Sequence, residues 1–219
     1  AEILTYFSPM SFARDATRYY LPLVIQSVSQ SLTYPLVATI TTRGEGGIDN
    51  LAAYAQGQAV LFVLSTIGAG LLVTGMVHGR TREGFARFAS LNTRIMLAAL
   101  LIQSLCIFPP VERLLFSVLL GLPPPLDTLA GRLFILSLPA QAFFFLRAPY
   151  QVALYNARAT LQANAATAGR IILTLLLSPL FIRLNWVGPY RAIVAFTVPI
   201  VLETLISKRM ARPYIETLP

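Results

Sequence analysis

Three polar side chains lie one helical turn apart in an apolar stretch near the middle of the chain. Arg147, Gln151 and Tyr155 are separated by four residues each, so a helix places them on one face. A guanidinium on that face attracts an anionic group, while the amide and the phenol offer neutral hydrogen bonds. Pro139 and Pro149 flank Arg147 in the sequence. We therefore expect these three residues to line a cavity that binds a solute.

The charge of Arg147 requires compensation. A rise of about 1.5 Å per residue from a helix end near Asn156 places Arg147 roughly 13 Å inside a membrane. A charge at that depth needs an ion pair or a water-filled cavity. Glu203 is the only acid within the expected helix cores, and Arg170 lies nearer the same side. The sequence predicts an intramembrane ion pair between Glu203 and either Arg147 or Arg170.

A second polar face contains Gln26 and Gln30, one turn apart and flanked by Pro22 and Pro35. In secondary transporters, broken helices beside polar side chains free backbone groups to meet a substrate. Polar residues of this kind also form interhelical hydrogen bonds that hold a bundle together. Under the first interpretation the two glutamines join the cavity lining.

A basic segment with two interleaved phenylalanines runs from His78 to Arg94. Its arginines either contact anionic lipid head groups or act only as a topology signal. The arginines concerned are Arg80, Arg82, Arg87 and Arg94.

The composition indicates which solvent surrounds these residues. Of the 219 residues, 56% are hydrophobic and only 12% are charged, and the mean hydropathy is +0.67. A water-soluble chain of this length needs a charged surface that such a composition cannot provide. The sequence therefore predicts an all-α polytopic integral membrane protein.

Apolar windows long enough to cross a membrane, about 20 residues each, lie between charged residues, Gly and Pro. Six are expected, at about residues 20–40, 51–77, 93–108, 133–156, 163–184 and 187–207. Residues 110–120 either lengthen the third window past a kink or form a short interfacial helix. Residues 1–219 are expected to form a single six-helix transmembrane domain.

The connecting segments differ in their content of basic residues, which concentrate in cytoplasmic loops. With both termini in the cytoplasm, twelve basic residues lie in inner segments and five in outer ones. We therefore expect both termini to be cytoplasmic. The inner residues are Arg14, Arg18, Arg80, Arg82, Arg87, Arg94, Arg147, Arg158, Arg170, Lys208, Arg209 and Arg212, and the outer ones are Arg43, Arg113, Arg132, Arg183 and Arg191.

The residue counts exclude several kinds of chemistry. One cysteine and one histidine, Cys106 and His78, cannot build a Cys- or His-based metal site, and neither a metal nor another cofactor is expected. No nucleophile and base stand at a readable spacing, and no phosphate-binding glycine loop is present, so an enzyme is not expected. The excess of 17 Lys and Arg over 9 Asp and Glu indicates membrane topology rather than nucleic-acid binding.

Short segments of the chain resemble a family of transporters. Residues 21–26 (LPLVIQ) with Gln30, residues 36–40 (LVATI) and residues 51–55 (LAAYA) resemble the first two helices of the multidrug and toxic-compound extrusion family. Residues 146–150 (LRAPY), 156–160 (NARAT) and 170–172 (RII) resemble its fourth-to-fifth-helix region. That family belongs to the multidrug/oligosaccharidyl-lipid/polysaccharide flippase superfamily, which includes the progressive-ankylosis transporters.

The resemblance implies one lobe, the N-terminal half, of such a transporter. Members generally have twelve or more helices in two related lobes, so a lone lobe would pair with a second copy or another subunit to enclose a pathway. Many extrusion-family members also carry an aspartate for cation coupling where this chain has Ala38. Proton or sodium coupling at this position is therefore not expected.

Two functions are compatible with these observations. The first is a half-size transporter that dimerises and moves an amphipathic or anionic solute by rocking one lobe against the other. The second is a structural or accessory subunit of a larger membrane assembly that has lost transport. Membrane lipids are expected partners in both cases.

Overall fold

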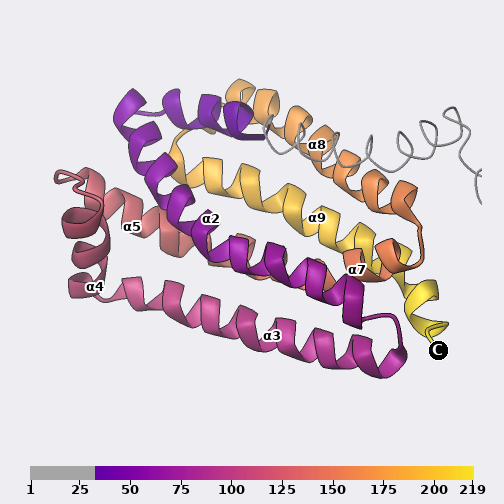
Figure 1. The fold of residues 1–219 in the computed structure, drawn as a ribbon. Coiled ribbons are helices and arrows are strands. Elements are labelled where there is room, and N and C mark those ends of the chain that lie inside the picture. The colour runs from indigo at the N-terminus through magenta and orange to yellow at the C-terminus, as the bar shows by residue number, and fades with distance from the viewer. Residues whose placement is uncertain (1–32) are drawn as a thin grey trace, which may run out of the picture.

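The structure, a computed structural model, describes residues 33–219, and this part of the chain is helical without any strand. Residues 33–42 form a helical segment that precedes α2. Figure 1 shows the long helices lying roughly side by side. The elements that follow are α2 (Gly47–His78), α3 (Arg82–Ser104), η2 (Leu105–Ile107), α4 (Pro109–Arg113), η3 (Leu114–Leu119), α5 (Leu126–Leu136), α6 (Leu138–Leu146), α7 (Ala148–Asn156), α8 (Thr160–Arg183) and α9 (Pro189–Glu216).

Four described helices, α2, α3 with η2, α8 and α9, are long and apolar enough to cross a membrane, and α5 to α7 supply a fifth span if counted as one bent helix. In the most apolar window of α2 only 17% of the residues are buried, and Val63 and Val73 are more than half exposed. Such a face is unfavourable in water and favourable in lipid, so the architecture is that of a helical membrane protein. The first expected window, 20–40, lies mostly outside the described residues.

The helices extend beyond the apolar windows of the sequence. The third helix begins at Arg82 rather than near residue 93, because the Thr81 hydroxyl accepts a hydrogen bond of 3.1 Å from the Gly84 amide and caps it. The fourth begins at Leu126 rather than 133. A hydropathy window detects the part of a helix that lies in lipid, and it misses polar turns at the ends. Residues 110–120 form the separate short elements α4 and η3.

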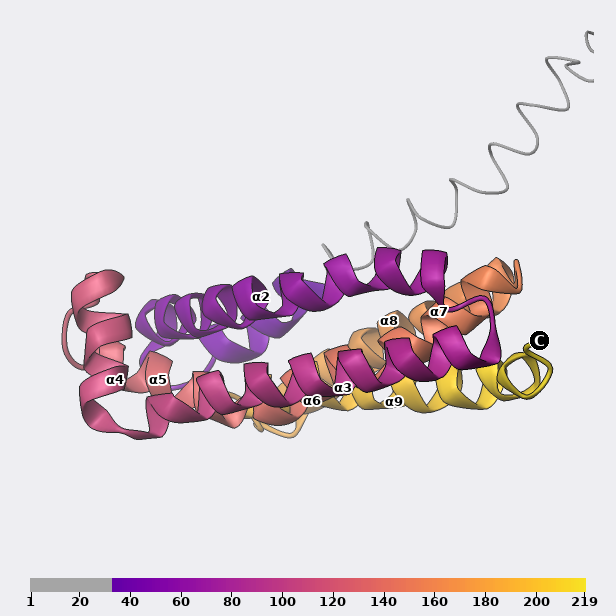
Figure 2. The same ribbon diagram turned by 60° about the horizontal axis from the view of Figure 1, so that its bottom comes forward.

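Connections that are distant in sequence meet at the two ends of the bundle. At one end the Arg82 amide donates a hydrogen bond of 2.7 Å to the Pro219 carbonyl, which joins the α2–α3 turn to the C-terminus. At the other end the Gly188 amide donates one of 2.9 Å to the Ile40 carbonyl. Figure 2 shows α4 at the end opposite the C-terminus. The α2–α3 turn, the α7–α8 connection and the C-terminus therefore lie at one end (Figure 1).

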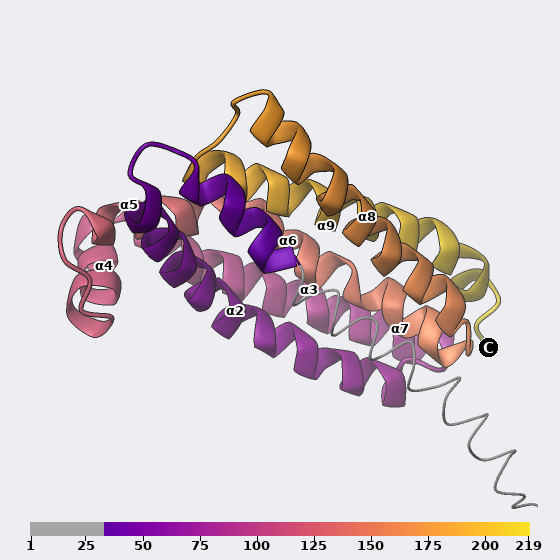
Figure 3. The same cartoon turned by 90° about the horizontal axis from the view of Figure 1, so that it is seen from above.

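Aromatic rings from four helical segments hold the middle of the bundle together. Phe62 of α2 lies 5.2 Å from Tyr34, 6.1 Å from Phe144 of α6 and 6.4 Å from Phe196 of α9, measured between ring centroids. Edge-to-face pairs at such distances add to the stabilisation that burial provides. Figure 3 shows the segment that precedes α2 lying between α2 and α8. This cluster fixes α2 beside α6, where the candidate site lies.

Candidate functional site

The candidate site is built around a break in the helix that follows α5. Helix α6 ends at Leu146, α7 begins at Ala148, and Arg147 occupies the junction. Pro149 lies in the first turn of α7, where its missing N–H is tolerated, but the ring ends the hydrogen-bond ladder of α6. Arg147 keeps helical backbone angles, and its amide still donates a hydrogen bond of 3.2 Å to the Phe143 carbonyl. The interruption is therefore a local loss of helical hydrogen bonds, and the Arg147 side chain is largely buried.

Arg147, Arg170 and Glu203 meet at this level. Arg147 Nη1 lies 2.6 Å from Glu203 Oε2, and Arg170 Nε lies 3.5 Å from the same oxygen. Thr167 Oγ1 donates a hydrogen bond of 2.9 Å to Glu203 Oε1. The Glu203 side chain is fully buried, and those of Arg147 and Arg170 are 11% and 4% exposed. Helices α8 and α9 and the α6–α7 junction are therefore tied together by one carboxylate.

The cluster carries a net positive charge, because one carboxylate faces two guanidinium groups. Glu203 makes its short contact with Arg147, whereas the Arg170 contact is longer. Arg170 Nη2 is buried, and among the described residues no group accepts a hydrogen bond from it. A buried cation that is only partly compensated attracts anions more strongly than the same group does in water.

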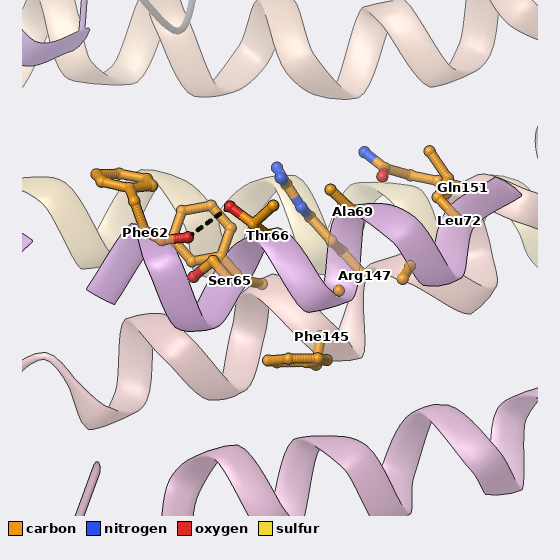
Figure 4. Close-up of a pocket in the computed structure, with 11 residues that line it drawn as sticks. Phe62, Ser65, Thr66, Ala69, Leu72, Phe145, Arg147 and Gln151 are labelled. Carbon is orange, nitrogen blue, oxygen red and sulfur yellow. Dashed lines mark hydrogen bonds between the residues drawn. The ribbon is translucent and has the colours of Figure 1, made fainter. Parts of the chain in front are cut away.

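Beside this cluster a cavity of about 270 Å³ lies between α2 and the α6–α7 junction. Figure 4 shows the Arg147 and Gln151 side chains directed to the same side of the cavity. The Arg147 guanidinium lies 4.9 Å from the centre of the Phe144 ring. Thr66 and Ala69 of α2 are exposed, so the cavity is open along this edge. Its lining consists of Phe62, Ser65, Thr66, Gly68, Ala69, Leu72, Phe144, Phe145, Arg147, Ala148 and Gln151.

The hydroxyl groups of the lining are engaged by the protein. Thr66 Oγ1 donates a hydrogen bond of 2.8 Å to the Phe62 carbonyl within α2. Ser65 Oγ lies 2.9 Å from the Leu61 carbonyl and 2.8 Å from Gln141 Oε1 on α6. The polar groups of the lining that remain for a solute are thus the Gln151 amide and the rest of the Arg147 guanidinium.

The structure separates the residues that the sequence assigned to one cavity. Arg147 and Gln151 line it, but Tyr155 does not. Tyr155 packs instead against the cluster of Ala153, Leu154 and Ala163. The hollow ends near Gln151, one turn before Tyr155, and the expected lining role of Tyr155 stays a prediction. Gln26 and Gln30 lie outside the described residues.

The four arginines considered for lipid contact are all exposed, at the α2–α3 turn and along α3. Arg80 Nε donates a hydrogen bond of 3.2 Å to the Met76 carbonyl, and Arg87 lies 2.5 Å from Glu83. Arg94 follows Arg82 by twelve residues, about 18 Å along the same helix. These arginines therefore do not gather at one depth.

Two buried amides on α3 form contacts that the sequence analysis did not anticipate. Asn92 Nδ2 donates a hydrogen bond of 3.0 Å to the Phe145 carbonyl, and Gln103 Nε2 donates one of 2.6 Å to the Phe134 carbonyl. Both acceptors lie at interruptions of the α5–α7 helix. The eleven-residue spacing of the two amides, close to three helical turns, was the available signal.

Within residues 33–219 no group of three or more His, Cys, Asp or Glu side chains lies in an arrangement that could hold a metal ion. The site offers one guanidinium, one amide and aromatic walls, which suit an anionic or amphipathic molecule.

Comparisons of the chain with protein-family models, with curated proteins and with solved structures found no match.

Proposed function

We propose that the chain is a half-size membrane transporter that moves an amphipathic or anionic solute as a dimer. The observation that carries this proposal is the position of Arg147, which stands at a helix break and reaches a cavity between apolar helices. Charged residues at membrane depth are costly and mark solute pathways. Interrupted helices place such groups at binding sites in secondary transporters.

The lining of the cavity matches the chemistry of the proposed solute. The Arg147 guanidinium and the Gln151 amide receive an anionic head, while Phe62, Leu72 and Phe145 contact an apolar body. The open edge at Thr66 and Ala69 faces the second copy, so that two half-cavities enclose one pathway.

Glu203 gives the site a way to release and recover Arg147. An arriving anion competes with Glu203 for the Arg147 guanidinium, and Arg170, 3.5 Å from the same carboxylate oxygen, retains Glu203 meanwhile. When the anion leaves, Arg147 returns to Glu203. The bound anion thus balances the net positive charge of the cluster, and Glu203 is shared by the two arginines again once the anion has left.

Flux through the site can be measured in vesicles that contain the purified protein. The probes are fluorescent lysophosphatidylglycerol and, as a neutral comparison, lysophosphatidylcholine, with an aqueous quencher reporting transfer between leaflets. We expect transfer of the anionic probe to fall at least tenfold in Arg147→Gln. Transfer is expected to persist in Arg183→Gln, which removes an exposed arginine at the C-terminal end of α8, away from the cavity. Equal transfer by wild type and Arg147→Gln would contradict the proposal.

The dimer can be tested separately. Cys106 is buried, so Cys106→Ala provides a background in which Thr66→Cys is the only thiol of the chain. A second copy that faces the cavity gives a disulfide-linked dimer on oxidation, whereas Arg183→Cys, at a helix end, stays monomeric. Crosslinking of both variants to the same extent would indicate random collision.

One observation favours the alternative, a non-transporting accessory subunit. Arg147 is already bound to Glu203 at 2.6 Å and is only 11% exposed, so the pair also functions as a fixed structural link. In that case the open edge of the cavity is covered by another protein. Isolation in mild detergent distinguishes the two: a homodimer supports transport, and a stable complex with other subunits supports the accessory function.

A further inference from the structure

A second hollow, of about 710 Å³, lies beside the C-terminal end of α9 and is distinct from the cavity at Arg147. Lys208, Arg209 and Arg212 line it together with Leu205, Ile215 and Glu216 at the same end of the chain and Tyr150 of α7. These three basic residues belong to the inner segments that indicate the membrane topology, and neither proposed function uses them.

The exposed face of α9 changes from apolar to basic over a short distance. Val194, Val198 and Leu205 are 39%, 41% and 55% exposed, and with Arg212 they lie within about 40° of one another around the helix axis. Lys208 and Arg209 flank this line and are also exposed. One continuous stripe therefore meets hydrocarbon along most of its length and ends in three cations.

The length of α9 places that change at the membrane surface. Its 28 residues span about 42 Å, which exceeds the roughly 30 Å hydrocarbon core of a bilayer. The end that carries Lys208 to Glu216 extends into the head-group region. The Pro219 carbonyl contacts the Arg82 amide, which joins this end to the α2–α3 turn.

Two of the three cations lack a charged partner. Arg212 Nε lies 2.8 Å from Glu216 Oε1, and this exposed pair carries no net charge. In the part of the chain that the structure describes, no carboxylate lies within 4.0 Å of Lys208 or Arg209. The hollow therefore presents a net positive charge directly above exposed apolar surface.

We propose that this hollow, formed by Lys208, Arg209, Arg212, Leu205 and Tyr150, binds the head group of an anionic phospholipid. The phosphate and the anionic head contact Lys208 and Arg209, and the acyl chains continue along Leu205, Val198 and Val194. An anionic lipid matches both parts of the surface, because its charged head and its hydrocarbon chains follow one another in the same order as the basic and apolar residues of α9. Each cation near an anionic lipid surface contributes about 1 kcal/mol, close to a fivefold gain in binding.

The experiment uses the full chain in mild detergent with added phosphatidylglycerol or phosphatidylcholine, and native mass spectrometry counts the bound lipids. Wild type is expected to retain phosphatidylglycerol in preference to phosphatidylcholine. Lys208→Gln/Arg209→Gln is expected to lose that preference by roughly tenfold to thirtyfold. Lys208→Arg/Arg209→Lys keeps the charge and is expected to keep the preference.

The matched control is Arg183→Gln/Arg191→Gln. It removes the same charge from exposed positions at the opposite end of the bundle, where α8 ends and α9 begins. This control is expected to retain phosphatidylglycerol as wild type does. An equal loss in both double variants would reduce the effect to net charge and overturn the proposal. Equal retention of the two lipids by wild type would overturn it as well.

Discussion

Asn92 of α3 donates a hydrogen bond of 3.0 Å to the carbonyl oxygen of Phe145 in α6. In an unbroken helix this carbonyl would accept from the amide of residue 149, which is a proline and has no N–H. Gln103, eleven residues after Asn92, serves the Phe134 carbonyl, eleven residues before Phe145. Two antiparallel helices are thus matched in register, with an amide on one opposite each interruption of the other.

Replacing Asn92 leaves the buried Phe145 carbonyl without its side-chain donor, whereas the Phe134 carbonyl still accepts a hydrogen bond of 2.6 Å from the Ser137 hydroxyl after Gln103 is replaced. Asn92 and Gln103 are 1% and 0% exposed, so water does not substitute easily. Asn92→Leu is expected to reduce the free energy of unfolding by about 1 kcal/mol, and at most ~2 kcal/mol. Gln103→Leu is expected to cost less, because Ser137 still donates to the Phe134 carbonyl. Chemical denaturation in detergent measures the loss. Ser90→Leu, at an exposed position of the same helix, is the control and is expected to be neutral.

The charged cluster predicts an asymmetry between its members. Glu203→Gln leaves Arg147 and Arg170 facing each other without a carboxylate, and is expected to cost roughly 3–5 kcal/mol of stability. Arg147→Gln leaves Arg170 with Glu203 as a balanced pair and is expected to cost less. Unfolding of both variants under identical conditions gives the order. A larger loss in Arg147→Gln than in Glu203→Gln would contradict the described charge balance.

Two glycines of α2 provide a matched test of helix packing. A Cβ at Gly75 would lie 2.6 Å from Phe88 Cζ and from Val152 Cγ2, whereas one at Gly70 would have no atom within 4 Å. Gly75→Ala is expected to lower the free energy of unfolding by about 1–3 kcal/mol because the helices must separate. Gly70→Ala is expected to be neutral, or stabilising by at most ~1 kcal/mol. The opposite order would show that the approach of α2 to α3 and α7 is looser than described.

Glu112 of α4 gives stability a dependence on pH. Burial, followed by the neighbouring Asp127 carboxylate, raises the pKa of Glu112 above its ordinary value of 4.5, although Arg132 and Arg113 oppose the shift. The folded protein therefore holds this proton more tightly than the unfolded chain does. The resulting stabilisation is complete below the ordinary pKa and is lost as pH rises through the raised one.

Glu112→Gln removes this loss. The variant is expected to unfold at a higher temperature than wild type at neutral pH, with the difference closing as the pH falls toward about 4. Thermal unfolding of both proteins across this range measures it. A difference that stays constant with pH would assign the effect to packing rather than to the charge of the carboxylate.

The sequence predicted helices better than it predicted contacts. The window at 51–77 lies within α2, and that at 163–184 nearly coincides with α8. Both apolar runs end close to charged residues or glycines, which mark their limits in the sequence. The ends of α3 and α5 were missed, since a cap such as Thr81 carries no hydropathy signal. Six spans were expected, and the described residues contain four or five.

The candidate site was predictable only where charge made a residue conspicuous. Arg147, Arg170 and Glu203 stand out because few charges occur in apolar helices, so their meeting could be anticipated. Asn92 and Gln103 were missed because an amide can serve many carbonyls, and only the fold determines which one lies opposite. Tyr155 lies outside this cavity, because spacing gives the face of a helix but not the length of a cavity.

The relation between Asn92 and Pro149 gives a final prediction in the form of a double-mutant cycle. Pro149→Ala restores an N–H that can donate to the Phe145 carbonyl within the helix, so the carbonyl no longer depends on Asn92. Asn92→Leu is therefore expected to cost clearly less in the Pro149→Ala background than in wild type. The difference between the two losses is the coupling energy, and it is expected to approach the full ~1 kcal/mol of the hydrogen bond.

Gln103→Leu provides the control for this cycle, because its acceptor Phe134 lies eleven residues away, about 16 Å along the helix. At that separation two substitutions are expected to act additively. Coupling of Pro149→Ala with Asn92→Leu but not with Gln103→Leu would show that Asn92 compensates the interruption at Pro149. If Asn92→Leu costs the same with and without the proline, the amide stabilises α3 for another reason, and the break at Arg147 forms independently of it.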